Sequence, residues 1–108
     1  MSIFIARMVH PDGPLWNTYV LEHISYLQTL IEQGHLLASG PVKGSPLRAG
    51  FLIFRADSRL EVQAFIDDDP FARENIISAL TIEQWDPLFG LLADESSKQL
   101  PSTLANAT

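Results

Sequence analysis

One short segment, RAGFLIFRA at residues 48–56, sets the strongest limit on what this chain can fold into. It is rich in aromatic and β-branched residues, which favours a β-strand. Side chains alternate between the two faces of a strand, so Phe51 and Ile53 point one way and Leu52 and Phe54 the other. Both faces of this strand are therefore apolar. Helices can cover one face of a sheet, and the other face needs a second surface, for which a partner subunit is the simplest source.

The rest of the chain supplies three more strands and two helices. The strands are SIFIARMV, HLLASGPV and SALTIEQW, at residues 2–9, 35–42 and 78–85. The last of these also reads as apolar on both sides.

From Leu15 the apolar spacing becomes helical. The positions of one broad face are Trp16, Val20, His23, Leu27 and Leu30, with Tyr19, Ile24 and Ile31 alongside. This pattern predicts a helix that ends near Gln33, with Gly34 just beyond it. A second helix is predicted after Ser58, whose hydroxyl can cap its first turn.

The resulting order is β-α-β-β-α-β, which predicts an α+β fold. Its simplest closure is a ferredoxin-like, four-stranded antiparallel sheet with both helices on one face. The chain has 108 residues, enough for one domain with a single core. We assign residues 1–92 to this domain. Residues 93–108 are mostly polar and lack a periodic apolar face, which predicts a flexible C-terminal tail.

The charge pattern excludes several classes of partner. The formal net charge is −6, and the two lysines, Lys43 and Lys98, stand alone. Nucleic-acid binding and anionic membrane surfaces require a basic face, so neither is expected. The chain has no cysteine, which excludes disulfides, thiolate zinc sites and cysteine nucleophiles. It has no 18-residue apolar run and no secretory leader, so we expect a cytoplasmic protein.

An acidic triplet, Asp67, Asp68 and Asp69, follows the second predicted helix and precedes Pro70. Negative charge is unfavourable at a helix C-terminus, so helix stability does not explain why three aspartates stand there. A solvated loop explains Asp67 and Asp68. Asp69 is different, because a residue before proline is held in an extended conformation and cannot continue the helix.

His23 lies on the apolar face of the first helix and has two interpretations. It can be a core histidine that donates to a backbone carbonyl. Alternatively, Asp69 accepts a hydrogen bond from one ring nitrogen, which fixes the tautomer and makes the other nitrogen a positioned base.

The remaining candidates are weaker. Phe71 is expected to line a cavity next to Asp69, and Ser39 and Gly40 are candidate substrate-binding residues. Trp16, Tyr19 and Trp85 are first of all core or interface candidates. His10 and His35 are expected in loops or at the surface. A metal held by His23, Asp69 and one of these two histidines is conceivable, but no close ligand spacing supports it, so neither a metal nor a cofactor is predicted.

Three segments together, EHISYLQTLIEQGHLLASGPV, AGFLIFRADS and FIDDDPF, resemble the YCII-related family of the dimeric α/β-barrel superfamily. The resemblance covers roughly residues 1 to 90. It implies that two sheets pack face to face across a homodimer, and that His23 and Asp69 form the site. Two positions depart from the family pattern. Val20 stands where an arginine is common, and Asn75 where a glycine is common, although asparagine also tolerates the left-handed backbone region.

Two functions of different classes follow. The first is a cofactor-independent isomerase or lyase that uses His23 and Asp69 as a general acid–base pair on a cyclic or aromatic-derived metabolite, as in aromatic compound catabolism. The alternative is a dimeric module that binds a small ligand or supports another enzyme without turnover. A purely structural dimer is a third, less favoured interpretation.

Overall fold

The structure is a computed structural model that describes residues 1–101. In chain order its elements are β1 (Ser2–Val9), α1 (Leu15–Glu32), β2 (Leu36–Pro41), β3 (Ala49–Ala56), α2 (Arg59–Asp67), α3 (Pro70–Arg73), β4 (Ala79–Trp85) and a 3-10 helix (Ala93–Glu95). The predicted order of strands and long helices is confirmed. The segment after the acidic triplet, expected as a turn, forms the short helix α3.

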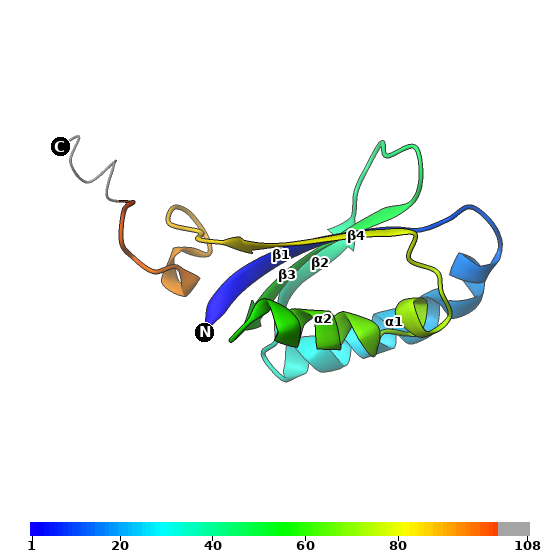
Figure 1. The fold of residues 1–108 in the computed structure, drawn as a ribbon, viewed down its shortest axis with the longest axis horizontal. Coiled ribbons are helices and arrows are strands. Elements are labelled where there is room, and N and C mark those ends of the chain that lie inside the picture. The colour runs from blue at the N-terminus through cyan, green and yellow to red at the C-terminus, as the bar shows by residue number, and fades with distance from the viewer. Residues whose placement is uncertain (102–108) are drawn as a thin grey trace.

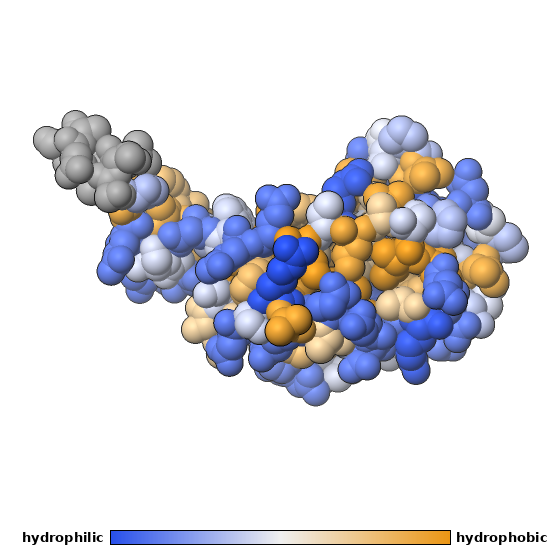
Figure 2. Space-filling model, viewed as in Figure 1, coloured by the Kyte–Doolittle hydropathy of each residue, from blue (hydrophilic) through white to orange (hydrophobic). Residues whose placement is uncertain are grey.

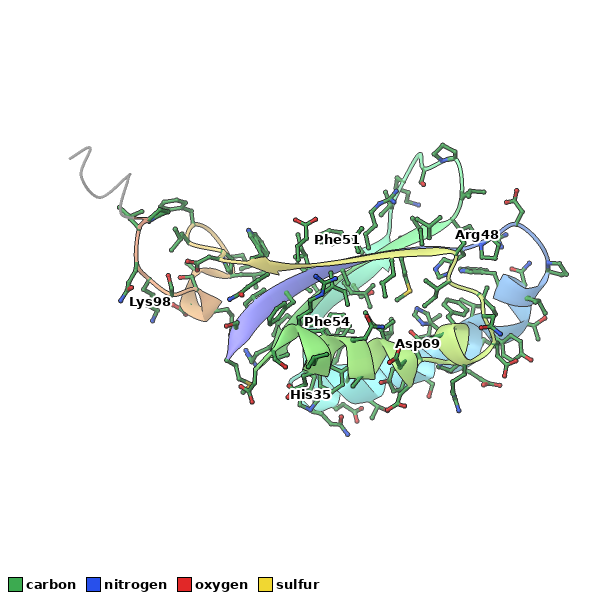
Figure 3. The ribbon with its side chains drawn as sticks, in the orientation of Figure 1. His35, Arg48, Phe51, Phe54, Asp69 and Lys98 are labelled. Carbon is green, nitrogen blue, oxygen red and sulfur yellow. The ribbon has the colours of Figure 1, made fainter. Side chains whose placement is uncertain are left out.

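The four strands form one antiparallel sheet in the order β2-β3-β1-β4. The helices α1, α2 and α3 lie together on one side of it, and within residues 1–101 the opposite side carries no helix (Figure 1). This is the ferredoxin-like α+β fold predicted from the element order. Phe51 and Phe54 lie on opposite sides of the sheet, as the alternation in β3 requires (Figure 3).

The core fills the layer between the sheet and the helices. Its buried members come from every strand, from the helices α1, α2 and α3, and from the loop before β4: Phe4, Ala6, Met8, Leu30, Leu36, Leu52, Phe54, Ala56, Val62, Ile66, Phe71, Ile76 and Ile82. Helix α1 contributes only Leu30 to this buried set. The broad apolar face predicted for that helix is therefore packed at one end only, and several of its other residues border a cavity described below.

Local signals end the helices where the sequence predicts. Gly34 follows α1 with φ of +81°, and Asn75 follows α3 with φ of 57°, the left-handed conformation that both residues tolerate. The Ser58 hydroxyl accepts a hydrogen bond from the Glu61 N–H at 3.2 Å and so caps α2. Tyr26 ties α1 to α2, because its hydroxyl donates to the Phe65 carbonyl at 2.6 Å. Burial raises the pKa of Tyr26 to about 12, so this donor stays protonated.

The open side of the sheet is apolar at its centre. Phe51 is 38% exposed there, and Ile5 lies opposite Ile53 in the β1–β3 register. The strand β4 does not continue this surface at its centre, because Thr81 and Glu83 occupy its open side between Ala79 and Trp85. The prediction that residues 78–85 are apolar on both sides was therefore wrong. In the view of Figure 2, hydrophilic residues dominate the lower rim, where the helices lie, and hydrophobic surface gathers closer to the sheet.

Residues 86–101 follow β4 and run beyond the end of the sheet, away from α1 and α2 (Figure 1). Arg55 of β3 donates to the Glu95 carboxylate, one of these hydrogen bonds measuring 2.9 Å, and also to the Gly34 carbonyl at 3.1 Å. The domain boundary at residue 92 stays a prediction, and residues 102–108 of the predicted tail lie outside the described part. Within residues 1–101, no helix is long and apolar enough to cross a membrane.

Candidate functional site

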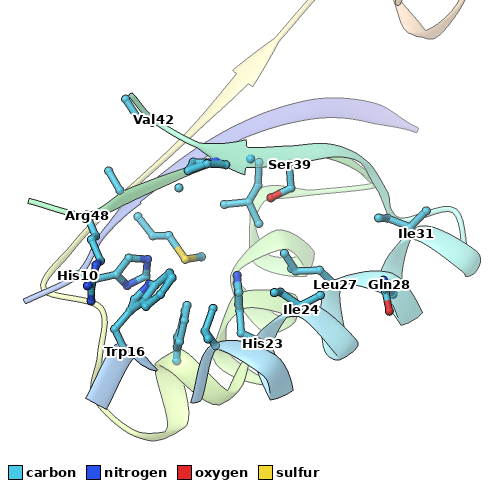
Figure 4. A pocket seen from close by; sticks show the side chains of 18 residues that line it. His10, Trp16, His23, Ile24, Leu27, Gln28, Ile31, Ser39, Val42 and Arg48 are labelled. Atoms are coloured by element: carbon cyan, nitrogen blue, oxygen red, sulfur yellow. The ribbon is translucent and has the colours of Figure 1, made fainter. Parts of the chain in front are cut away.

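A pocket of ≈ 550 Å³ opens between α1 and the sheet (Figure 4). Its volume is that of a site for a small organic molecule. The lining residues come mainly from β1, α1, β2 and β3: Met8, His10, Trp16, Val20, His23, Ile24, Leu27, Gln28, Ile31, Ser39, Gly40, Pro41, Val42, Arg48, Ala49, Gly50, Leu52 and Phe71. Most of these side chains are apolar, so a few polar groups decide what the pocket can do.

Asp69 is positioned by the break between α2 and α3. Its backbone is extended, with φ of −66° and ψ of 134°, and Pro70 occupies the first position of α3. The carboxylate turns back and accepts a hydrogen bond from the Phe71 N–H at 2.9 Å, which caps α3. Asp69 is only 1% exposed, whereas Asp67 and Asp68 are exposed. The acidic triplet thus contains one inward carboxylate and two solvated ones, as predicted.

His23 and Asp69 lie in direct contact. The Nδ1 atom of His23 is 2.7 Å from Oδ2 of Asp69 and 2.9 Å from Oδ1. A carboxylate can only accept, so Nδ1 carries a proton, and in the neutral ring Nε2 keeps its lone pair. Among residues 1–101 no side chain bonds to Nε2, and His23 points from α1 into the space beneath the strands (Figure 4). The pair therefore presents a fixed ring nitrogen to any molecule in the pocket.

The Phe71 ring packs on one face of the His23 ring. The two rings stack at a centroid distance of 4.1 Å and an interplanar angle of 16°. Phe71 is 1% exposed and lines the pocket, as the sequence predicts. Since its N–H also bonds to Asp69, this one residue fixes both members of the pair.

His10 is a correction to the sequence analysis, which expected a loop or surface position. It is 4% exposed and lines the pocket. Its backbone N–H donates to the Arg48 carbonyl at 2.8 Å, so the β1–β3 pairing continues one residue beyond Val9. The alternation of Met8 and His10 then turns the imidazole inward. Extending the apolar alternation of residues 4–8 by one step would have found it.

The His10 ring has its own fixed tautomer. Its Nδ1 donates to the Ile76 carbonyl at 2.7 Å, because a carbonyl only accepts. The ring meets Phe71 edge-on, with centroids 4.7 Å apart. Burial lowers the pKa of His10, so the ring is a neutral acceptor at neutral pH.

The other predicted residues divide between the pocket and the rest of the fold. Ser39 and Gly40 line the pocket from β2, and Trp16 lines it from α1. Tyr19 and Trp85 are not among the lining residues. His35 is half-buried outside the pocket and packs on Phe65, with ring centroids 4.6 Å apart.

No metal centre is evident in the described part of the chain, where no three His, Cys, Asp or Glu side chains are grouped to hold an ion. The polar groups facing the pocket are instead suited to proton transfer and hydrogen bonding.

The two walls of the pocket are held differently. The first, formed by His10, His23 and Phe71, is packed against the core and backed by the buried Asp69. The second, formed by β2 and the outer side of α1, is more exposed: Ser39 and Gly40 are exposed, and Ile24 and Ile31 are 43% and 49% exposed. One wall of the pocket is thus packed against the protein core, and the other faces solvent.

Known proteins resemble this chain both in sequence and in structure. The profile of the YCII-related domain matches residues 12–86. The structure is similar to that of 5-chloro-2-hydroxyhydroquinone dehydrochlorinase (TftG) from Burkholderia phenoliruptrix AC1100 in complex with 2,5-dihydroxybenzoquinone. The identity is 25%, the TM-score is 0.68, and the match covers 78% of this chain and 93% of that one.

A further solved structure shows the same fold. Protein Atu4242 from Agrobacterium tumefaciens is 17% identical with a TM-score of 0.51, over 81% of this chain and 93% of that one. A dimeric ferredoxin-like protein of unknown function from Jannaschia sp. CCS1 is 16% identical with a TM-score of 0.49, over 80% and 99%. No match is found among curated proteins.

Proposed function

The chain belongs to the YCII-related family, and we propose that it is a small-molecule enzyme in which His23 and Asp69 act as a general acid–base pair on a cyclic, aromatic-derived compound. One observation carries this proposal. The Nδ1 atom of His23 lies 2.7 Å from a carboxylate oxygen of Asp69, while the opposite side of the ring faces a pocket of ≈ 550 Å³. A base held in one tautomer at a cavity wall is the arrangement that proton transfer requires.

The proposed reaction begins when Nε2 of His23 takes the proton of a ring hydroxyl. The electron pair moves into the ring, a ring carbon accepts a proton, and the ketone tautomer forms. Its conversion to a different tautomer completes an isomerisation. If the protonated carbon carries a halogen, loss of halide with its bonding pair and of a second hydroxyl proton gives a quinone, so the net change is loss of HX. Asp69 orients the imidazole and stabilises the imidazolium that forms during each transfer.

The similarity to TftG supports the choice of substrate class. That protein is a dehydrochlorinase of a chlorinated hydroxyhydroquinone, and its structure holds a dihydroxybenzoquinone. Both are flat, oxygenated six-membered rings, and the pocket of this chain is lined mostly by apolar side chains, which suit such a ring. The proposed chemistry moves protons and a leaving group only, so it requires no redox cofactor.

We also propose that the protein is a cytoplasmic homodimer that pairs through the open side of its sheet. Phe51 and Ile53 would be buried between two copies, which removes apolar surface from water at the centre of the sheet. Sedimentation at micromolar protein concentration tests this, and a stable monomer would contradict it.

Turnover of a chlorinated hydroxyhydroquinone tests the enzymatic proposal. We expect the wild-type protein to release chloride and to form a quinone that absorbs visible light, whereas His23→Gln should be slower by about 10²–10⁴. The matched control is His35→Gln, a histidine outside the pocket, which should keep wild-type activity.

Two outcomes would contradict the proposal in different ways. Equal turnover by His23→Gln would mean that His23 is a core histidine. Tight binding of oxygenated rings, with no turnover of halogenated or tautomerisable compounds, would favour the non-catalytic binding module.

A further inference from the structure

The pocket holds one permanent charge. Among its lining residues Arg48 is the single arginine or lysine, and no aspartate or glutamate lines it. Asp69 stands behind His23 and is 1% exposed. The chain as a whole carries a formal charge of −6, so the charge at the cavity is opposite in sign to the net charge of the protein. A ligand in this pocket meets a positive charge and no negative one.

Arg48 is held in place at one end of the pocket. Its carbonyl accepts a hydrogen bond from the His10 N–H at 2.8 Å, which anchors its backbone at the start of β3. Its guanidinium carbon lies over the Trp16 ring, 4.4 Å from the ring centre, so the cation contacts the face of the indole. Figure 4 shows Arg48, His10 and Trp16 together at the same end of the cavity.

The guanidinium of Arg48 has no acidic partner in the described part of the chain. The ion pairs there are His23–Asp69 and Arg55–Glu95, and no hydrogen bond from the Arg48 side chain is formed. Beside the contact with Trp16, the edge of the guanidinium with its N–H donors has no protein partner among residues 1–101. That edge is the part that binds a planar oxyanion, in many cases through two parallel hydrogen bonds.

From this geometry we propose that Arg48 is the anion-binding residue of the pocket and that the substrate is an anionic oxygenated ring, with an ionised hydroxyl or carboxylate on the guanidinium. This inference rests on the proposed function for the ring and its chemistry. The anionic oxygen on Arg48 sets the orientation of the ring, and a second ring position then faces Nε2 of His23. Arg48 also neutralises part of the negative charge that enters the ring when His23 removes a proton.

A pair of ligands with the same ring tests the proposal. The first is 2,5-dihydroxybenzoquinone, a vinylogous acid that is ionised at neutral pH. The second is 2,5-dimethoxybenzoquinone, which has the same ring and no ionisable group. Binding of each is measured by calorimetry to wild-type protein, Arg48→Gln and Arg48→Lys, with Arg59→Gln, an exposed arginine on α2, as the matched control.

We expect wild-type protein to prefer the anion. Arg48→Gln should weaken binding of the anion by about 10- to 100-fold, the effect of losing a charge-assisted contact, and leave the neutral ligand within about twofold. Arg48→Lys should recover part of the loss, because a point charge lacks the planar fork. Arg59→Gln should bind both ligands as the wild type does.

Three results would overturn the inference: a wild-type preference for the neutral ring, binding of neither ring, or equal weakening of both by Arg48→Gln in a variant that melts like the wild type. Failure of the proposed function looks different. In that case the anion still depends on Arg48 in calorimetry, while no ligand of the class is turned over and His23→Gln changes no rate.

Discussion

Replacing Asp69 separates its role in stability from its role in catalysis, because alanine and asparagine remove different things. The carboxylate accepts hydrogen bonds from the Phe71 N–H and from Nδ1 of His23. Its Oδ1 atom lies 2.9 Å from each of these two donors. Asp69→Ala leaves both donors without a protein partner. An unsatisfied buried donor costs about 1–3 kcal/mol, and water in the pocket can reach part of the His23 ring, so we expect a loss of about 2–4 kcal/mol in the free energy of unfolding.

Asp69→Asn keeps an oxygen at the position of Oδ1 and so keeps the cap of α3. We expect it to lose only about 1 kcal/mol, the difference between a charge-assisted and a neutral hydrogen bond. Its NH₂ group takes the position 2.7 Å from Nδ1 and favours the tautomer in which Nε2 carries the proton. The base is then lost, and no carboxylate stabilises the imidazolium. Activity should fall by about 10²–10⁴ in a protein that remains folded.

Three measurements decide the matter: urea unfolding, turnover, and ¹⁵N NMR of the imidazole nitrogens. The protonated nitrogen of His23 should change from Nδ1 to Nε2 in Asp69→Asn. Combining His23→Ala with Asp69→Asn should be barely slower than the slower single variant, because the two residues act as a unit. The reasoning is refuted if Asp69→Asn keeps wild-type turnover, or if Asp69→Ala unfolds at the wild-type urea concentration.

Three further predictions concern the sheet, the tail and His10. Ile53→Asp should dissociate or unfold the proposed dimer in sedimentation, because burying an unpaired charge costs several kcal/mol, whereas Leu60→Asp on the outer side of α2, where Leu60 is 81% exposed, should not. Truncation after Leu92 should lower the melting temperature by only a few degrees, since it removes one partly exposed ion pair, Arg55–Glu95, worth no more than about 1 kcal/mol; a loss above ~15 °C would mean that the segment packs on the domain. Burial lowers the pKa of His10 from its ordinary 6.5, so the unfolded chain binds that proton more readily and stability should fall as the pH drops below 6.5. In His10→Gln this part of the pH dependence of urea unfolding should be absent, and an unchanged dependence would show that His10 does not titrate as described.

Patterns with a strong local cause were predictable from the sequence. The strand at residues 48–56, the end of α1 at Gly34 and the cap at Ser58 each follow from the side chains of a few neighbouring residues. The extended backbone of Asp69 follows from the proline after it in the same way. These features depend little on the rest of the fold.

Features that depend on pairing between distant segments were harder to predict. His10 lies 38 residues before Arg48, and only their backbone hydrogen bond shows that β1 extends far enough to bury the imidazole. The contribution of Arg48 to the pocket was missed for the same reason, since a lone arginine before a strand carries no local signal. The error on β4 had a different cause, because strict alternation within SALTIEQW places Thr81 and Glu83 on one side.

The unequal burial of the two pocket walls has a consequence for how this protein could acquire new substrates. Substitutions in the core-packed wall should destabilise the fold. Phe71 belongs to the hydrophobic core and Asp69 caps a helix, in addition to their places at the site. Ser39, Ile24 and Ile31 face solvent and can be exchanged at little cost to folding. A combinatorial library confined to those three positions should therefore yield mostly folded variants that differ in ligand choice. Gene duplication followed by drift at the same positions would diversify ligand choice by the same route.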